Sequence, residues 1–328
     1  MQSIPDFDSL PPVPGQPQGN AWGLWGDDDQ LGTLNLLTPK TILAAKHEIR
    51  LGKSVSLDLA LDHFPPLAGR RQPEHEVISL KQGGRYDKYG FDDALRFNTQ
   101  ASSQWDGLRH IALQESALYY NGVSHDDIAA GRHDRNGIHK WVERGGIVGR
   151  AVLLDYARWR QETGQPYAPP NTSFAVTVAE LDAVAAYQNV QFRSGDILII
   201  RFGFIEWHDQ ATPEERAATF SAGTYIGLER SMETVRWLWN HHFAALAGDT
   251  VGFECCPSQW KKVPGTQGGV NLHEWILAHW GCPLGELWNL EQLAVVCDGA
   301  KKWTFFFTSA PLYVVGGVAS PPNAIAVL

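Results

Sequence analysis

The sequence lacks the short motifs that most readily reveal an enzyme class. Its 328 residues contain no GxGxxG after a strand pattern, no GxxxxGK[ST], no GxSxG and no HExxH. The first two motifs form phosphate-binding loops, the third carries the nucleophile of α/β-hydrolases, and the fourth binds zinc in metalloproteases. The usual grounds for predicting a dinucleotide enzyme or an ordinary α/β-hydrolase are therefore missing.

Cysteine is scarce, and the four that occur are not arranged in a CxxC pair: Cys255, Cys256, Cys282 and Cys297. A chain of 328 residues can bury a sizeable core without covalent links, so a disulfide framework is not expected. Reduced, buried thiols are typical of a reducing compartment. We therefore expect a cytoplasmic protein.

Positive charge and long apolar runs are also scarce. Lys and Arg number 27 against 36 Asp and Glu, which gives a formal charge of -9, and no run of basic residues is present. Nucleic acid and acidic membrane surfaces are thus not expected as partners. No stretch reaches the length of a membrane span, and the first residues have neither the basic start nor the apolar region of a signal peptide.

The patterns that are present predict a folded α/β protein. The first twenty residues hold five prolines and are expected to form an extended arm, 1–21, ahead of one domain, 22–328. Thr38-Pro39 is typical of a helix start, and Thr177 with Glu180 forms a capping-box pattern. Strands are expected at 54–62, 147–154 and 195–204, helices at 39–51, 177–188 and about 227–240, and irregular loops at 67–93. Because these elements alternate without an internal repeat, we predict one α/β domain around a mixed sheet.

The chemistry is expected in the segment QASSQWDGLRH, from Gln100 to His110. A helical turn starting at Asp106 would place this carboxylate and the imidazole of His110 on one face. If the preceding residues are extended, Gln104 and Asp106 share a face as well. Taken alone, an Asp-His pair at this spacing is more often part of a solvated helix face than of a site.

At these residues the chain resembles the cyclase family of metal-dependent hydrolases, which includes bacterial kynurenine formamidase and isatin hydrolase. The family pattern is HxGTHxDxxxH. Asp106 stands at the aspartate ligand and His110 at the last histidine, which acts as an acid/base group in the family. Gln100 and Gln104 stand where the family has its first two histidines, and Ser102 and Ser103 replace the Gly-Thr.

Other segments resemble the family in the same order along the chain. They are WGDDDQLGTLNLLTP, GIVGRAVLLD, GDILIIRFG and LHEWILAHWGCPLGELWNL, and together they extend from about Trp22 to Gly317. In the family, a histidine and a glutamate near the C-terminal end complete the site, and His273 and Glu286 stand 13 residues apart in a matching context. The resemblance also implies a swivelling β/β/α-like fold, a sheet or open barrel surrounded by helices, and a homo-oligomer.

The resemblance implies a hydrolase that opens an amide, lactam, lactone or ester bond of a small aromatic substrate with metal-activated water. One divalent ion would supply both the nucleophile and a positive charge near the developing oxyanion. Asp106, His273 and Glu286 are the expected ligands, and Gln104 would add a carbonyl oxygen. This oxygen-rich set favours Mn²⁺ over Zn²⁺, with Mg²⁺ as a further option. His110 would take up and return the proton.

Four further residues are candidate substrate contacts. Trp105 lies between Gln104 and Asp106, Trp25 and Phe91 lie in segments that the resemblance places around the pocket, and Arg109 could attract an anionic group. For most individual tryptophans, simple packing is the more common role.

Two other functions remain open at this point. The glutamines at the two histidine positions favour a metal-free cyclase or dehydratase, in which His110 and a carboxylate move protons. The third interpretation is a small-ligand-binding protein that has lost the chemistry of the family.

Overall fold

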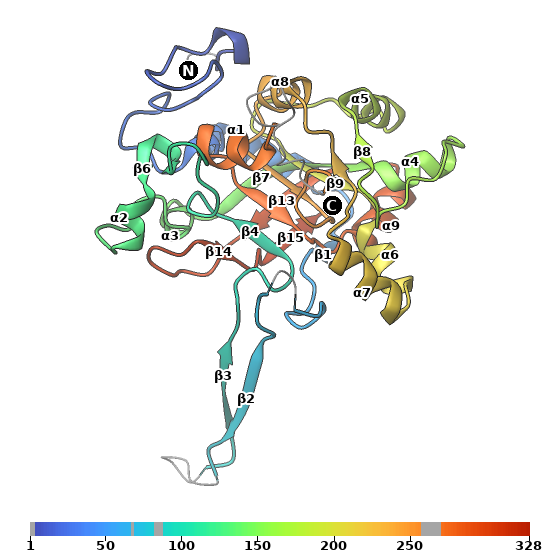
Figure 1. Ribbon diagram of the computed structural model, residues 1–328. Helices are drawn as coiled ribbons and strands as arrows, with labels where there is room; N and C mark the ends of the chain where they lie inside the picture. Colours follow the sequence, from blue (N-terminus) through green and yellow to red (C-terminus); the bar gives the residue numbers. More distant parts are fainter. Residues whose placement is uncertain (1–3, 67–68, 82–87, 257–269) are drawn as a thin grey trace.

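A computed structural model describes residues 4–66, 69–81, 88–256 and 270–328. Within these residues, nine strands form one strongly curled mixed sheet in the order β1-β15-β13-β7-β9-β11-β12-β4-β14. The four central strands β7, β9, β11 and β12 are parallel, and the strands on both sides of them are antiparallel to their neighbours. Figure 1 shows helices packed around this half-barrel. The predicted α/β domain around a mixed sheet, or open barrel, is confirmed.

The strands of the main sheet are β1 (Ser54–Ser56), β4 (Gln104–Asp106), β7 (Ile147–Asp155), β9 (Ile197–Arg201), β11 (Ala245–Gly248), β12 (Leu284–Glu286), β13 (Thr304–Ser309), β14 (Ala319–Ser320) and β15 (Ala324–Val327). Three two-stranded pairs lie outside it: β2 (Glu74–Ser79) with β3 (Phe91–Arg96), β5 (Leu118–Tyr119) with β6 (Val123–Ser124), and β8 (Ala175–Val176) with β10 (Gly227–Leu228).

The α-helices of the described residues are α1 (Pro39–Ala45), α2 (His125–Ala129), α3 (His139–Glu143), α4 (Tyr156–Glu162), α5 (Val178–Tyr187), α6 (Phe204–Gln210), α7 (Pro213–Ala222), α8 (Met232–Asn240) and α9 (Glu291–Ala300). Shorter 3₁₀ turns are η1 (Phe7–Ser9), η2 (Gly32–Leu36), η3 (Lys46–Glu48) and η4 (Tyr120–Gly122), and η5 (Glu274–His279) is a π-helix.

The core lies on both faces of the sheet because its central strands are apolar along most of their length. In β9, Leu198 and Ile200 pack into one buried cluster, whereas Ile197 and Ile199 pack into the cluster on the other face. A strand covered on both faces has no solvent side to carry polar residues, which explains the continuous run ILII. The structure thus confirms a strand in each of the predicted ranges 147–154 and 195–204, although β9 is limited to Ile197–Arg201.

The helix starts follow the local sequence signals. The hydroxyl of Thr38 accepts a hydrogen bond from the backbone N–H of Thr41, with Pro39 in the first helical position. Thr177 and Glu180 form the predicted capping box at the start of α5. Both caps satisfy backbone donors that have no partner inside the helix.

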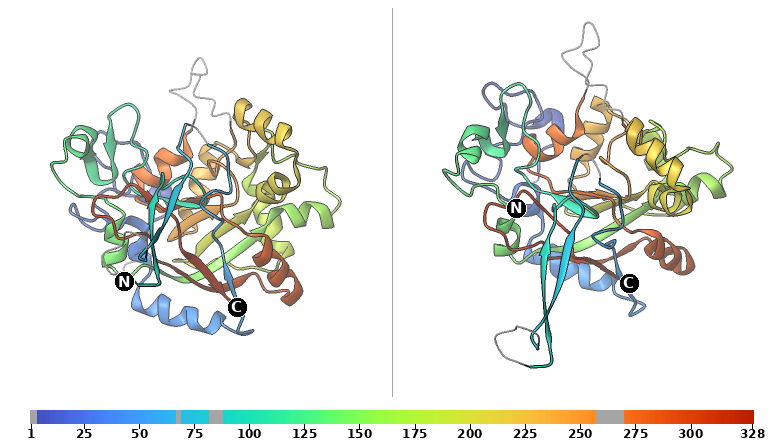
Figure 2. Two further views of the ribbon diagram at one scale, coloured as in Figure 1. Left: turned by 90° about the horizontal axis from the view of Figure 1, so that it is seen from below. Right: turned by 60° about the horizontal axis from the view of Figure 1, so that its bottom comes forward.

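Three predictions need correction. The segment 67–93 is not an irregular surface loop throughout, because 74–79 pair with 91–96 as an antiparallel ribbon that projects from the body (Figures 1 and 2). The strand expected at 54–62 is restricted to Ser54–Ser56, and the helix that starts at Pro39 ends at Ala45.

The proline-rich segment at the start packs on its own chain. Phe7 and Leu10 are buried, and the centroid of the Phe7 ring lies 5.4 Å from that of Trp275.

Candidate metal and acid/base site

The site is built on two neighbouring strands near the end of the sheet. β4 and β12 pair antiparallel with Gln104 opposite Glu286 and Asp106 opposite Leu284. Because side chains alternate along a strand, Gln104, Asp106 and Glu286 share one face. This confirms the expectation that Gln104 and Asp106 lie together on extended backbone. The helical turn expected to start at Asp106 does not form, because this residue still belongs to the paired strand β4.

A tight turn after β4 brings His110 back over Asp106. The N–H of Gly107 donates to the carbonyl of Val318 at 2.9 Å, and that of His110 donates to the carbonyl of Gly107 at 2.9 Å. A Cβ atom on residue 107 would lie 2.5 Å from the Val318 oxygen, so this close approach requires glycine. His110 Nε2 thereby lies 3.6 Å from Asp106 Oδ2.

The two residues from the C-terminal part of the chain reach the same place. His273 precedes the π-helix η5, and its Nε2 lies 3.0 Å from Glu286 Oε1 and 3.9 Å from Asp106 Oδ2. One ligand atom each of Asp106, His273 and Glu286 lie within 4.8 Å of one another. The structure therefore brings together the four residues Asp106, His110, His273 and Glu286.

Sequence reasoning missed Glu254, which holds His273 in place. Its carboxylate lies 2.6 Å from His273 Nδ1 and accepts hydrogen bonds from the backbone N–H groups of Leu272 and His273. Arg230 Nε lies 2.8 Å from its other oxygen. A carboxylate on one imidazole nitrogen directs the other nitrogen to the site. The one available signal in the sequence was an acidic residue beside the apolar residues Phe253 and Cys255.

The two glutamines use their amide groups as donors. Gln100 Nε2 donates to Asp106 Oδ1 at 2.6 Å, and Gln104 Nε2 donates to the same oxygen at 3.2 Å and to Glu286 Oε2 at 2.8 Å. Asp106 Oδ2 and Gln104 Oε1 are buried and accept no hydrogen bond from the described residues. Each glutamine thus stabilises a carboxylate and the cluster keeps two buried oxygens without a donor.

Burial and mutual charge set the protonation of the cluster. Complete burial raises the pKa of Asp106, although His110 and His273 act in the opposite direction. Burial alone would lower the pKa of His273, but hydrogen bonds to Glu254 and Glu286 outweigh it and raise this pKa well above its ordinary value. The hydrogen bond from His273 likewise overcomes burial and lowers the pKa of Glu286. Without a metal, His273 is a cation between carboxylates.

The residues present fit a divalent ion. Two carboxylates and one imidazole converge within bonding reach of a common point, and the two buried oxygens without donors belong to the same cluster. A buried oxygen without a partner is costly, and a cation would remove that cost. The donor set is richer in oxygen than in nitrogen, which suits Mn²⁺ or Mg²⁺ as well as Zn²⁺.

Two of the predicted substrate contacts, Trp105 and Arg109, have other roles in the structure. Trp105 points to the opposite face of β4, where its completely buried ring packs against Trp141 and Trp288 and its Nε1 donates to Ser309. It supports the strand from behind, which corrects the prediction from its position in the sequence. The guanidinium of Arg109 donates to the carbonyls of His133, Arg135 and Gly316, so it braces loops instead of facing a ligand.

Trp25 and Phe91 also lie apart from the cluster. The Trp25 ring lies 6.5 Å from that of Trp239, beside the N-terminal segment. Phe91 is 72% exposed at the outer end of the β2–β3 ribbon. A cavity of about 480 Å³ lies between α4 and α6 and is lined by none of the four site residues. Leu287, next to Glu286, packs with Phe64, Phe204 and Tyr225 in a buried apolar cluster.

The comparisons with known proteins agree with this architecture. Residues 30–255 match the family described as Putative cyclase. A solved structure described as a novel cyclase is 32% identical, with a TM-score of 0.81, and the match covers 94% of this chain and 99% of that one. The chain therefore belongs to this cyclase family.

More distant structures share the fold. Isatin hydrolase A from Ralstonia solanacearum is 17% identical with a TM-score of 0.56, over 88% of this chain and 97% of that one. An isatin hydrolase bound to the product analogue thioisatinate is 13% identical with a TM-score of 0.57, over 89% of this chain and 99% of that one. No protein of curated function matches the chain in sequence. In the described residues, every helix is too short or too polar to cross a membrane.

Proposed function

We propose that this protein is a hydrolase that opens an amide, lactam, lactone or ester bond of a small aromatic substrate with one divalent metal ion. The observation that carries the proposal is the convergence of Asp106, His273 and Glu286, with ligand atoms within 4.8 Å of one another. Membership of the cyclase family and the shared fold with isatin hydrolases support it. An ion held there would supply an activated water and a positive charge for the developing oxyanion.

Each residue has a distinct part in this proposal. Asp106, His273 and Glu286 would hold the ion, and Gln104, whose Oε1 accepts no hydrogen bond from the described residues, would add a carbonyl oxygen. Glu254 keeps His273 in the tautomer that presents Nε2. His110 Nε2, 3.6 Å from Asp106 Oδ2, is placed to accept a proton from the nucleophile and to return it to the leaving group. Its side chain is 19% exposed, so substrate can reach it from solvent.

The hydrogen bonds of the two glutamines favour a site for one metal ion over a site for two. Gln100 and Gln104 both donate to Asp106 Oδ1, so this oxygen is occupied by N–H groups and only Oδ2 is left for a cation. We infer Mn²⁺ as the preferred ion, with Zn²⁺ and Mg²⁺ as the alternatives, because carboxylate and amide oxygens dominate the set.

The test combines metal content with turnover. Wild-type protein, Asp106→Asn and His110→Asn are analysed by mass spectrometry for bound metal and assayed with formyl-anilines, isatin-like lactams and aryl lactones. We expect one equivalent of metal and turnover of one substrate class in the wild type, loss of both in Asp106→Asn, and loss of turnover alone in His110→Asn. Equal turnover by all three proteins would refute the proposal.

A second candidate is a metal-free cyclase or dehydratase, and two hydrogen bonds favour it. The amide N–H groups of Gln100 and Gln104 stabilise the Asp106 carboxylate without a metal ion. In that case Asp106, His110 and His273 would exchange protons with the substrate directly. Activity that survives exhaustive chelation, in protein shown to be free of metal, would select this candidate. Tight binding of an aromatic acid without any turnover would select a binding protein.

We also infer that the protein is a homo-oligomer in which the β2–β3 ribbon contacts a second copy. A two-stranded ribbon is marginally stable alone, and this one carries Val77, Phe91 and Leu95 on a single face at 60%, 72% and 53% exposure. The opposite face carries mainly charged residues, among them Glu74, Glu76 and Asp92. A projecting ribbon with three exposed apolar side chains on one face suits an isologous contact. Cytoplasmic localisation stays a prediction from composition.

A further inference from the structure

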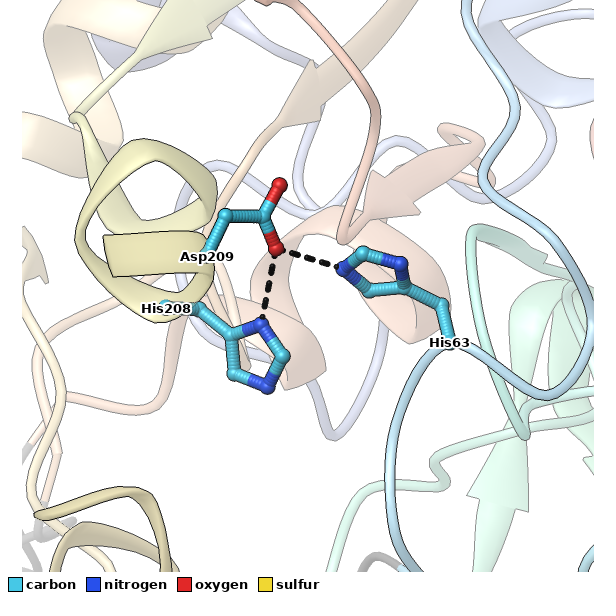
Figure 3. A group of neighbouring side chains, drawn as sticks. All are labelled: His63, His208 and Asp209. Atoms are coloured by element: carbon cyan, nitrogen blue, oxygen red, sulfur yellow. Dashed lines mark hydrogen bonds and ion pairs between the residues drawn. The ribbon is translucent and has the colours of Figure 1, made fainter. Parts of the chain in front are cut away.

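A second group of metal-binding side chains lies outside the site described above. His63 follows the segment that leaves β1, and His208 and Asp209 are consecutive residues of α6. Asp209 Oδ1 lies 2.9 Å from His63 Nε2 and 3.1 Å from His208 Nδ1. Figure 3 shows the carboxylate between the two imidazole rings, with one nitrogen of each ring directed at it.

The group offers two nitrogens and one oxygen in a small space. One ligand atom from each of the three side chains lies within 4.8 Å of the other two. The imidazole rings of His63 and His208 have centroids 5.1 Å apart and are tilted by 43°, so they do not stack on each other. Three donors at this separation match a zinc ion with three protein ligands, for which two imidazoles and a carboxylate are a common set.

The surroundings hold the two histidines in place. The ring of Phe64 packs against both, at 4.9 Å from His63 and 4.8 Å from His208, and Phe220 lies 6.0 Å from His208. His208 is 1% exposed, whereas the side chains of His63 and Asp209 are 23% and 48% exposed. One ligand is therefore fixed in the core, and the other two open a route for an ion from solvent.

A positive charge also lies beside the group. Arg216 Nη2 donates to the backbone carbonyl of Asp209 at 3.2 Å. The carboxylate of Asp209 supplies the negative charge that offsets a cation beside this arginine.

We propose that His63, His208 and Asp209 form a second metal site that binds Zn²⁺ or a similar nitrogen-preferring transition-metal ion, with water completing the coordination. The nitrogen-rich set separates it from the oxygen-rich set at Asp106, His273 and Glu286, which favours a different ion. It is independent of the proposed hydrolase function, because no residue is shared.

The position of the second site points to a structural role. Just before His63, the carbonyl of Ala60 accepts a hydrogen bond from Ser102 Oγ at 2.7 Å, and the N–H of Leu59 donates to Ser103 Oγ at 2.9 Å. Ser102 and Ser103 lead directly into β4, which carries Gln104 and Asp106. An ion that joins His63 to α6 would therefore fix the segment that braces the start of β4.

The experiment counts bound metal in the full chain without a histidine tag. Metal-stripped wild type, His63→Ala, Asp209→Ala and the control His75→Ala are dialysed against Zn²⁺, and the bound zinc is measured by mass spectrometry. His75 is an exposed histidine 3.1 Å from Asp93 on the β2–β3 ribbon. It therefore offers the same histidine-aspartate pair as the proposed site but lacks the second histidine. We expect His63→Ala and Asp209→Ala to bind one equivalent less than wild type, and His75→Ala to bind as much.

A second set of variants separates the two sites. In an Asp106→Ala, Glu286→Ala background, one equivalent of zinc should remain, and adding His63→Ala should remove it. Co²⁺ provides a direct readout, because its visible absorption in the background variant reports nitrogen ligands and should disappear with His63→Ala. Circular dichroism establishes that each variant is folded. Unchanged zinc content and unchanged Co²⁺ absorption in folded His63→Ala would overturn the second site, whatever the first site binds.

Discussion

Gln104 and Glu286 face each other across the β4–β12 pair, and the amide Nε2 donates to the carboxylate at 2.8 Å. The same Nε2 also donates to Asp106, so one glutamine connects both carboxylates of the proposed metal site. A histidine cannot reproduce this contact, because each of its ring nitrogens carries at most one hydrogen. The glutamine is therefore a specific change in the chemistry of the site.

Restoring histidines at both positions should strengthen metal binding. In Gln100→His, Gln104→His, two amide donors are replaced by imidazoles that can act as ligands, and Asp106 Oδ1 is released from its hydrogen bonds. We expect the affinity for Zn²⁺ to rise about tenfold or more, because nitrogen ligands suit this ion. Competition with a chromogenic chelator measures the change, and Gln114→His is a control outside the cluster. Equal affinity in wild type and the double variant would contradict the assignment.

Removing the Glu254 carboxylate should weaken metal binding without touching a ligand. Glu254→Ala removes the acceptor for His273 Nδ1, so the imidazole loses its fixed orientation. Changes of this kind typically cost 10–100-fold in metal affinity. Glu254→Gln retains an oxygen acceptor and should lose less. Calorimetric titration of both variants with Mn²⁺ checks the order, and a larger loss in the glutamine variant would count against the role of Glu254.

His110→Asn should separate catalysis from metal binding. Its imidazole lies near Asp106 but is not among the three converging ligands. Removing a general acid/base typically lowers turnover by about 10²–10⁴-fold. We expect a loss of this size in kcat with the metal content unchanged. A parallel fall in bound metal would show that His110 is a ligand instead.

The stability of the protein should depend on the buried His279 at acid pH. Burial lowers the pKa of His279 to about 4, and Asn20 Nδ2 lies 2.9 Å from its Nδ1, as expected for a neutral acceptor ring. Because the unfolded chain takes up the proton near pH 6.5, stability should be complete above that pH and fall as the pH drops towards 4. The loss at pH 4 should be about 3 kcal/mol.

Urea unfolding at several pH values measures this effect. His279→Gln cannot take up a proton, so its free energy of unfolding should vary less between pH 6.5 and 4 than that of the wild type. His75 is exposed, so the free energy of unfolding of His75→Gln should depend on pH in the same way as that of the wild type. Parallel curves for wild type and His279→Gln would show that other groups set the acid dependence.

The face of the β2–β3 ribbon that carries Val77, Phe91 and Leu95 should be required for oligomerisation. Val77→Asp places a charge on the face that carries Phe91 and Leu95, whereas Ala94→Asp places it on the opposite face. We expect Val77→Asp to shift the protein to the monomer in analytical ultracentrifugation and Ala94→Asp to leave the oligomer intact. A monomeric wild type, or equal behaviour of the two variants, would exclude the proposed contact.

Local signals in the sequence predicted much of the fold. The caps at Thr38 and Thr177 and the apolar run of β9 depend on neighbouring residues, and each occurs where the pattern indicated. The β2–β3 ribbon was missed because its strands carry many charged residues and are exposed on both faces. A ribbon without a buried face shows no clear alternation between apolar and polar residues.

For the candidate site, the chemical types could be read from the sequence, namely the Asp106 carboxylate, the His110 imidazole and the glutamines at 100 and 104. That His273 and Glu286 reach them, that Glu254 orients His273 and that Trp105 faces away became clear only from the three-dimensional arrangement. The physical reason is that strand pairing and turns set these distances across separations of up to 182 residues. The His63 group shows the same limit, since nothing local to residue 63 indicates that α6 packs beside it.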